Sequence, residues 1–88
     1  MLAETFKAMG DETRREILHL LRSGSMTAGE IAAHFAMSAA TVSHHLSVLK
    51  SAELITDERR GKYILYTLNA SVFEEMILWL CSFGEGEK

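Results

Sequence analysis

The 88-residue sequence predicts one mainly α domain with a small β-hairpin, built as four helices, two strands and a fifth helix. Three observations support this prediction. Apolar residues recur at helical spacing over most of the chain, and the period changes to two only from Leu54 onward. A single core normally carries roughly 100 to 150 residues, so residues 1–88 form one domain.

The first two helices are separated by a glycine. The first is predicted over residues 2–9 from apolar side chains at i, i+4 and i+7, namely Leu2, Phe6 and Met9. Gly10 ends it, and Asp11 then caps a second helix that begins at Glu12. The apolar face of the second helix consists of Ile17, Leu18 and Leu21. Gly24 closes this helix.

Residues 27–52 read as two helices joined by a tight turn. Thr27 and Glu30 match a capping box, which opens a short helix with Ile31 and Phe35 inward. Ser38 can cap another helix only about three residues after the first one ends. This spacing is typical of a helix-turn-helix.

The C-terminal part is predicted to be a hairpin followed by a helix. The short strand Leu54–Thr56 pairs with a strand over residues 63–68, and the charged segment DERRGK between them supplies the turn, with Gly61 for a positive φ. Ser71 and Glu74 match a second capping box, so the last helix is expected over residues 71–83.

The helix from Ala39 to Ala52 has two distinct faces. Val42, Leu46 and Leu49 lie within about 60° of one another and mark the buried face. The opposite face carries Ala40, Ser43, His44, Ser47 and Ser51. Thr41 and Val48 lie on one flank, and His45 lies near the buried edge. Such small side chains let a helix enter the DNA major groove, although a solvated serine-rich helix has the same composition.

The net charge of −3 argues against a nucleic-acid partner until it is divided along the chain. Residues 1–37 carry −1, residues 38–69 carry +1 and residues 70–88 carry −3. A DNA-binding surface is therefore expected from the middle third, with the last segment turned away. Arg59, Arg60 and Lys62 at the hairpin turn would reach the flanking DNA backbone or the minor groove, although a charged hairpin tip is usually only a solvated turn.

Two stretches resemble the ArsR/SmtB family of winged helix-turn-helix repressors: AMGDETRREILHLL, and the run from Met26 to Asn69. The resemblance covers about Phe6 to Phe83 and is most specific in SAATVSHHLSVL, residues 38–49. It implies a homodimer held by helices about 2–9 and 71–83, a helix-turn-helix over 27–52 and a wing over 54–68. Two such recognition helices would read an inverted repeat in successive major grooves.

The resemblance also implies site residues. The DNA-binding set is Ser38, Ala39, Ala40, Thr41, Ser43, His44, Arg59, Arg60 and Lys62. The dimer-interface set, which is also the widest apolar surface of the terminal helices, is Leu2, Phe6, Val72, Phe73, Met76, Ile77, Trp79 and Leu80. Two departures stand out: Ala39 and Ala40 offer fewer hydrogen bonds than the usual family residues, and Glu12 replaces a proline that suits the same first turn.

Metal sensing, common among relatives, is not expected. Thr27 and Gly29 occupy the positions of the family's Cys-x-Cys ligands, and the last helix has Glu74 and Glu75 but no histidine. No cofactor is predicted. His19 and His34 are expected to be partly buried or surface residues, and Cys81 a core thiol. The pattern is most similar to the SdpR-like subgroup, small autorepressors of toxin-immunity operons that lack a metal site.

The predicted function is a sequence-specific DNA-binding transcriptional repressor, an autorepressor that binds an inverted-repeat operator as a homodimer. Its partners are double-stranded DNA and a second copy, with a sequestering partner protein as a further candidate. The alternative is a protein-interaction module whose apolar C-terminal helix docks a partner. No nucleophile and base come together, so no enzyme is expected. The single cysteine and the absence of a signal or membrane segment predict a cytoplasmic protein without membrane insertion.

Overall fold

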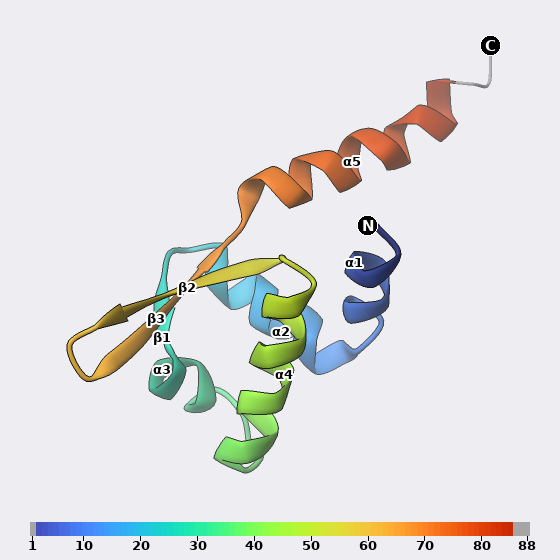
Figure 1. Ribbon diagram of the computed structural model, residues 1–88. Coiled ribbons are helices and arrows are strands. Elements are labelled where there is room, and N and C mark those ends of the chain that lie inside the picture. Colours follow the sequence, from blue (N-terminus) through green and yellow to red (C-terminus); the bar gives the residue numbers. More distant parts are fainter. Residues whose placement is uncertain (1, 86–88) are drawn as a thin grey trace.

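The computed structural model describes residues 2–85 as five helices and a three-stranded sheet (Figure 1). The elements are α1 Leu2–Ala8, α2 Glu12–Leu21, β1 Met26–Thr27, α3 Ala28–Ala32, α4 Ala39–Ser51, β2 Ile55–Arg60, β3 Tyr63–Leu68 and α5 Ala70–Glu85. The mainly α class, the helix order and the hairpin are as predicted from the sequence. The helix-turn-helix pair is α3 and α4, and the wing is the β2–β3 hairpin.

Three of the predicted helix caps are present. The Asp11 carboxylate accepts the Arg14 backbone N–H at 3.0 Å at the start of α2. Thr27 and Glu30 form the reciprocal capping box that opens α3, and Ser38 Oγ accepts the Thr41 backbone N–H at 3.1 Å at the start of α4. Each cap satisfies a backbone donor that has no partner within its helix, and so fixes where the helix begins.

The hydrophobic core lies where α2, α3 and α4 meet the sheet. Its fully buried side chains come from several elements: Ile17, Ile31, Val42, Leu46, Leu49, Leu54 and Ile55. α2 and α4 contribute the apolar faces that their helical periodicity predicts, because each presents one stripe to the same interior. This packing fixes the orientation of α4, and its polar side is left on the surface.

The sheet differs from the predicted hairpin in two ways. The strand order is β1-β3-β2, and the added strand β1 pairs Met26 with Tyr66. β2 does not end at Thr56 but pairs with β3 as far as Arg60 opposite Tyr63, so the six-residue DERRGK turn is wrong. Only Gly61, with φ 61°, and Lys62 connect the strands. A two-residue turn is favoured because it lets the charged segment satisfy its backbone groups in the ladder.

The predicted capping box at Ser71 and Glu74 is also wrong, because α5 already begins at Ala70. The Asn69 carbonyl accepts the Val72 N–H at 3.2 Å, and the Asn69 side-chain amide donates to the Glu53 carbonyl at 2.8 Å. Glu53 follows α4 with φ 64°. Asn69 therefore links the start of α5 to the end of α4.

α5 extends away from the body of the domain as an arm (Figure 1). The molecule measures 52 × 24 × 22 Å as a result. Met76 is buried at 4% exposure, whereas the side chains of residues 77–84 are exposed. Within residues 2–85, no helix has the length and apolar character needed to cross a membrane.

Candidate nucleic-acid interface

α4 presents its polar face to solvent as the periodicity predicts. Val42, Leu46 and Leu49 are at most 2% exposed and hold the helix against the core. The exposed side chains of α4 include Ala39, Ala40, Thr41, Ser43, His44, Ser47 and Ser51. All are small except His44, so this face can approach another surface closely. A helix with side chains is roughly 10 to 12 Å across, similar to the major groove of B-DNA.

The N-terminus of α4 is exposed and has no negative charge that would repel an anion. Ser38 Oγ and Thr41 Oγ1 lie 2.8 Å apart, and both residues are exposed. The first turn of α4 contains no acidic side chain. The positive end of the helix dipole is therefore not neutralised by the protein, which favours a phosphate near this turn.

The two adjacent histidines of α4 differ in their surroundings. His45 is partly buried, with Nδ1 3.3 Å from Arg14 Nη1 and 3.9 Å from Asp11 Oδ2. The hydrogen bond from the Arg14 backbone lowers the pKa of Asp11, and the charges of His45 and Arg14 lower it further. His45 thus belongs to the packing of α2 on α4. His44 is exposed, and its ring centroid lies 5.9 Å from that of His45.

The wing carries its three basic residues in unequal settings. Arg59, Arg60 and Lys62 are all exposed. Arg60 forms an ion pair with Glu58, whose Oε2 lies 3.1 Å from Arg60 Nε, and the hydrogen bond to Glu58 raises the pKa of Arg60. Alternate residues of a strand point to opposite faces, so Arg59 lies on the other side of the ribbon from this pair. The three cations of the wing are therefore not equivalent, although nothing in the sequence distinguishes them.

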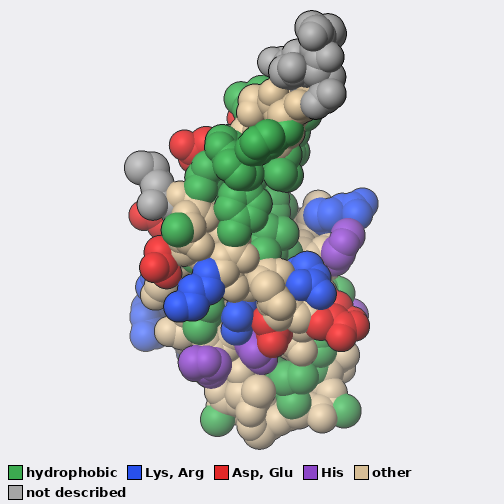
Figure 2. Space-filling model, turned by 90° about the vertical axis from the view of Figure 1, so that its right-hand side faces the viewer, with side chains coloured by type: hydrophobic (Ala, Val, Ile, Leu, Met, Phe, Trp, Pro, Cys, Tyr) green, Lys and Arg blue, Asp and Glu red, His purple; other side chains and the backbone are tan. Residues whose placement is uncertain are grey.

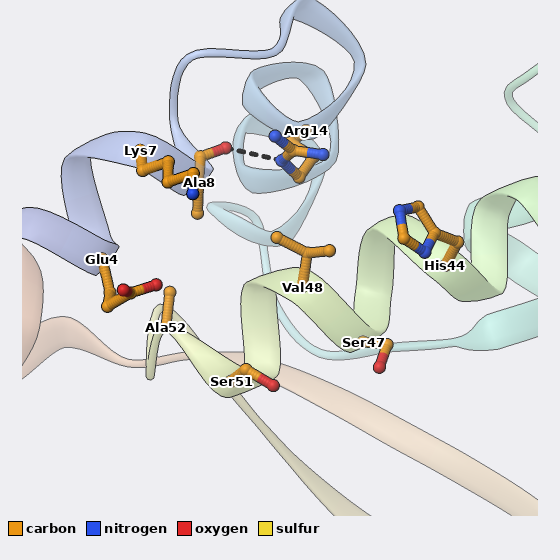
Figure 3. A pocket seen from close by; sticks show the side chains of 9 residues that line it. All are labelled: Glu4, Lys7, Ala8, Arg14, His44, Ser47, Val48, Ser51 and Ala52. Carbon is orange, nitrogen blue, oxygen red and sulfur yellow. Dashed lines mark hydrogen bonds between the residues drawn. The ribbon is translucent and has the colours of Figure 1, made fainter.

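A pocket beside α4 adds residues that the sequence analysis missed. It has a volume of about 440 Å³ and is lined by Glu4, Lys7, Ala8, Arg14, His44, Ser47, Val48, Ser51 and Ala52. Figure 3 shows α1 and α2 along one side of this α1–α4 pocket and α4 along the other. Lys7 and Arg14 come from a segment whose net charge is −1, so charge counting along the chain gave no signal for them.

The predicted interface residues form an apolar surface over α1 and α5. Ile77, Trp79 and Leu80 are about half exposed, and Leu2, Phe6, Val72 and Phe73 are partly buried. Leu78 and Phe83 are exposed at 72% and 60% and were missed. Figure 2 shows hydrophobic side chains along the arm, with Lys, Arg and His side chains below them.

Two predictions about α5 side chains differ from the structure. Met76 lies in the core of its own chain, so it supports α5 from within and has little surface to offer a second copy. Cys81 is exposed and is not a core thiol, because α5 leaves the domain body before reaching it. Trp79 connects α5 to α1 through its ring contact with Phe6, at a centroid distance of 5.5 Å.

The described part of the chain contains no cluster of side chains suited to binding a metal ion. No three His, Cys, Asp or Glu side chains among residues 2–85 lie close enough together to hold a metal ion. His19 and His34 are exposed surface residues, as the sequence predicts. The polar face of α4, the wing and the α1–α4 pocket are instead suited to binding a polyanion.

Comparisons with known proteins give a consistent result. The family model described as bacterial regulatory protein, arsR family, matches residues 11–57. The transcriptional repressor SdpR of Bacillus subtilis is 53% identical over 78 residues, which cover 89% of this chain and 87% of that protein. A crystal structure of an ArsR family transcriptional regulator superposes with a TM-score of 0.90 at 27% identity, covering 96% of this chain and 92% of that one.

A solution structure from Mycobacterium bovis is also similar. It is described as a homodimeric winged helix-turn-helix DNA-binding domain, and it superposes with a TM-score of 0.78 at 29% identity. The match covers 97% of this chain and 80% of that one. The described homodimer belongs to that protein.

Proposed function

The chain belongs to the ArsR family of bacterial regulatory proteins, and from this premise we propose that it acts as a homodimer whose two α4 helices read an inverted-repeat operator. It is a winged helix-turn-helix DNA-binding transcriptional repressor and not an enzyme. The observation that carries the proposal is the exposed face of α4, which combines small side chains with one histidine over a firmly anchored apolar side.

The homodimer is supported by the apolar surface of the arm. Ile77, Leu78, Trp79, Leu80 and Phe83 are between 46% and 72% exposed on a single helix. Monomeric proteins rarely expose so large a contiguous apolar patch. A second copy offers the same patch, and a two-fold axis pairs it with itself. A symmetric dimer then presents two α4 helices to DNA, which is the arrangement that an inverted repeat requires.

The proposal includes repression of the protein's own gene in the cytoplasm, which follows from the resemblance to the SdpR-like subgroup. The similarity to the SdpR repressor supports the repressor function itself. A sequestering partner protein was a further candidate from the sequence, but no residue in the described part of the chain identifies such a partner. The competing function is a protein-interaction module that uses the same apolar arm. The two functions differ in the physical origin of binding, because phosphate contacts release counterions and apolar contacts do not.

A salt series on the wing variants separates the two functions. For wild-type protein, the affinity for duplex DNA is expected to fall with a log-log slope of about −0.9 per neutralised phosphate. Arg59→Ala is expected to weaken operator and random DNA alike and to reduce the slope by about one per wing. Arg60→Ala is expected to do less, because Glu58 already offsets its charge. Fluorescence anisotropy between about 50 and 200 mM salt measures the affinity of the wild type, Arg59→Ala and Arg60→Ala.

A binding affinity that hardly responds to salt would contradict the DNA-binding proposal and favour the interaction module. If Arg60→Ala weakened DNA binding more than Arg59→Ala, the expectation for Arg60 would be wrong. The ion pair between Arg60 and Glu58 would then have to break when the protein binds DNA.

A further inference from the structure

We propose that the α1–α4 pocket binds a phosphodiester group of the DNA backbone, with Lys7 and Arg14 as its cationic ligands. The inference rests on the proposed DNA-binding function and adds a contact site outside both the helix-turn-helix and the wing. The ligand class is a phosphodiester in the backbone that borders the groove entered by α4.

The width of α4 relative to the major groove places the sugar-phosphate backbone of one DNA strand over this pocket. The major groove is roughly 12 Å wide and a helix with side chains roughly 10 to 12 Å, so α4 fills the groove and sugar-phosphate chains lie along its flanks. One wall of the pocket is formed by His44, Ser47 and Ser51, which belong to the groove-facing side of α4. The opposite wall comes from α1 and α2 (Figure 3). A backbone strand on that flank therefore runs across the pocket.

Arg14 is held in place before any ligand binds. Its Nε donates to the Ala8 carbonyl at 2.6 Å, and its Nη1 lies 3.3 Å from His45 Nδ1. A guanidinium has five N–H donors, so these two contacts leave others for the pocket that Arg14 lines. Because the side chain is already ordered, less conformational entropy is lost when it binds a phosphate oxygen.

The charges of the pocket favour an anion at one end. Neither Lys7 nor Arg14 takes part in an ion pair within 4.0 Å among residues 2–85. Asp11 is the acidic residue near Arg14, because the charge of Arg14 lowers the pKa of Asp11, but its carboxylate accepts the Arg14 backbone N–H and does not line the pocket. Lys7 is exposed in the last turn of α1 and can swing toward a phosphate. Glu4 is the acidic residue of the lining, and Figure 3 places it beside Ala52, at the end away from His44. The phosphate is therefore assigned to the end between Arg14 and His44.

A pair of lysine variants tests the site. Lys7→Ala is expected to weaken binding roughly tenfold on both a selected operator duplex and a random duplex, with the salt slope reduced by about 0.9 per phosphate lost. Lys7→Arg keeps the positive charge, so it is expected to retain the wild-type affinity and salt slope. The matched control is Lys50→Ala, because Lys50 is also exposed but already forms an ion pair with Asp57 at 3.0 Å. Sedimentation of each variant checks that the oligomeric state is unchanged.

Neutralising the acidic residue of the pocket gives an independent check, because the expected change in affinity has the opposite sign. Glu4→Gln removes the carboxylate of the same pocket, so it is expected to strengthen binding several-fold at low salt and to have less effect at high salt. Equal affinities and salt slopes for Lys7→Ala and Lys50→Ala would overturn the phosphate site. If Arg59→Ala still reduced the slope in that case, the DNA-binding function would stand. A wild-type slope near zero would overturn both.

Discussion

Replacing Leu78 with aspartate is expected to convert the homodimer into a monomer and to weaken operator binding on the order of 10²- to 10⁴-fold. Leu78 is 72% exposed in the single chain, so the substitution leaves the core of the protomer intact. A charge buried in an apolar interface without a partner carries a large desolvation cost. The loss in DNA binding is large because two linked α4 helices bind with an effective concentration that one helix lacks.

The oligomeric state of the Leu78→Asp variant is read from sedimentation at micromolar concentration, and its fold from circular dichroism. Ser71→Asp is the matched control, since it adds the same charge to an exposed position of α5 outside the apolar patch. Trp79→Ala is a weaker form of the test because Trp79 also contacts Phe6 of its own chain. A Leu78→Asp variant that remains dimeric would contradict the assignment of this part of the arm to the dimer interface.

Replacing His44 with alanine is expected to cost on the order of 1 to 3 kcal/mol at the operator and clearly less on random DNA. His44 is the largest exposed side chain on the groove-facing side of α4, and Ala39 and Ala40 offer base edges no hydrogen bonds. Sequence preference therefore depends strongly on His44 and Ser43. Titration of both duplexes at one salt concentration measures the difference.

His34→Ala is the control for the His44 variant, because His34 is exposed but lies between α3 and α4, outside the groove-facing side. His45→Ala is not a suitable control, because His45 lies within 3.9 Å of Asp11 and packs α2 against α4. Equal losses on operator and random DNA for His44→Ala would show that this side chain only positions the helix. The base-reading role would then be wrong.

The parts of the fold that were predictable from sequence are those set by neighbours in the chain. The caps at Asp11, Thr27 and Ser38 join residues three positions apart, and the two faces of α4 follow from its period alone. β1 has only two residues, so it leaves no period to detect and depends on pairing with β3. The role of Asn69 at the start of α5 was missed because its side-chain amide donates to the Glu53 carbonyl, sixteen positions away.

The candidate site shows the same division. The exposed face of α4 was predicted residue by residue, since burial of Val42, Leu46 and Leu49 determines what remains outside. The α1–α4 pocket was not predicted, because it exists only where Lys7 and Arg14 are brought beside α4 by packing. The Arg60 contact with Glu58 depended on the true length of β2, which the charged composition of that segment concealed.

The central claim is that a symmetric pair of α4 helices reads DNA, and selection of bound fragments from random duplex DNA tests it most directly. The expected result is an enriched inverted repeat whose half-site centres lie about one helical turn, roughly 10 to 10.5 base pairs, apart. We expect the Leu78→Asp variant to enrich no inverted repeat. Enrichment of a single unrepeated site, or of no sequence at all, would contradict the claim.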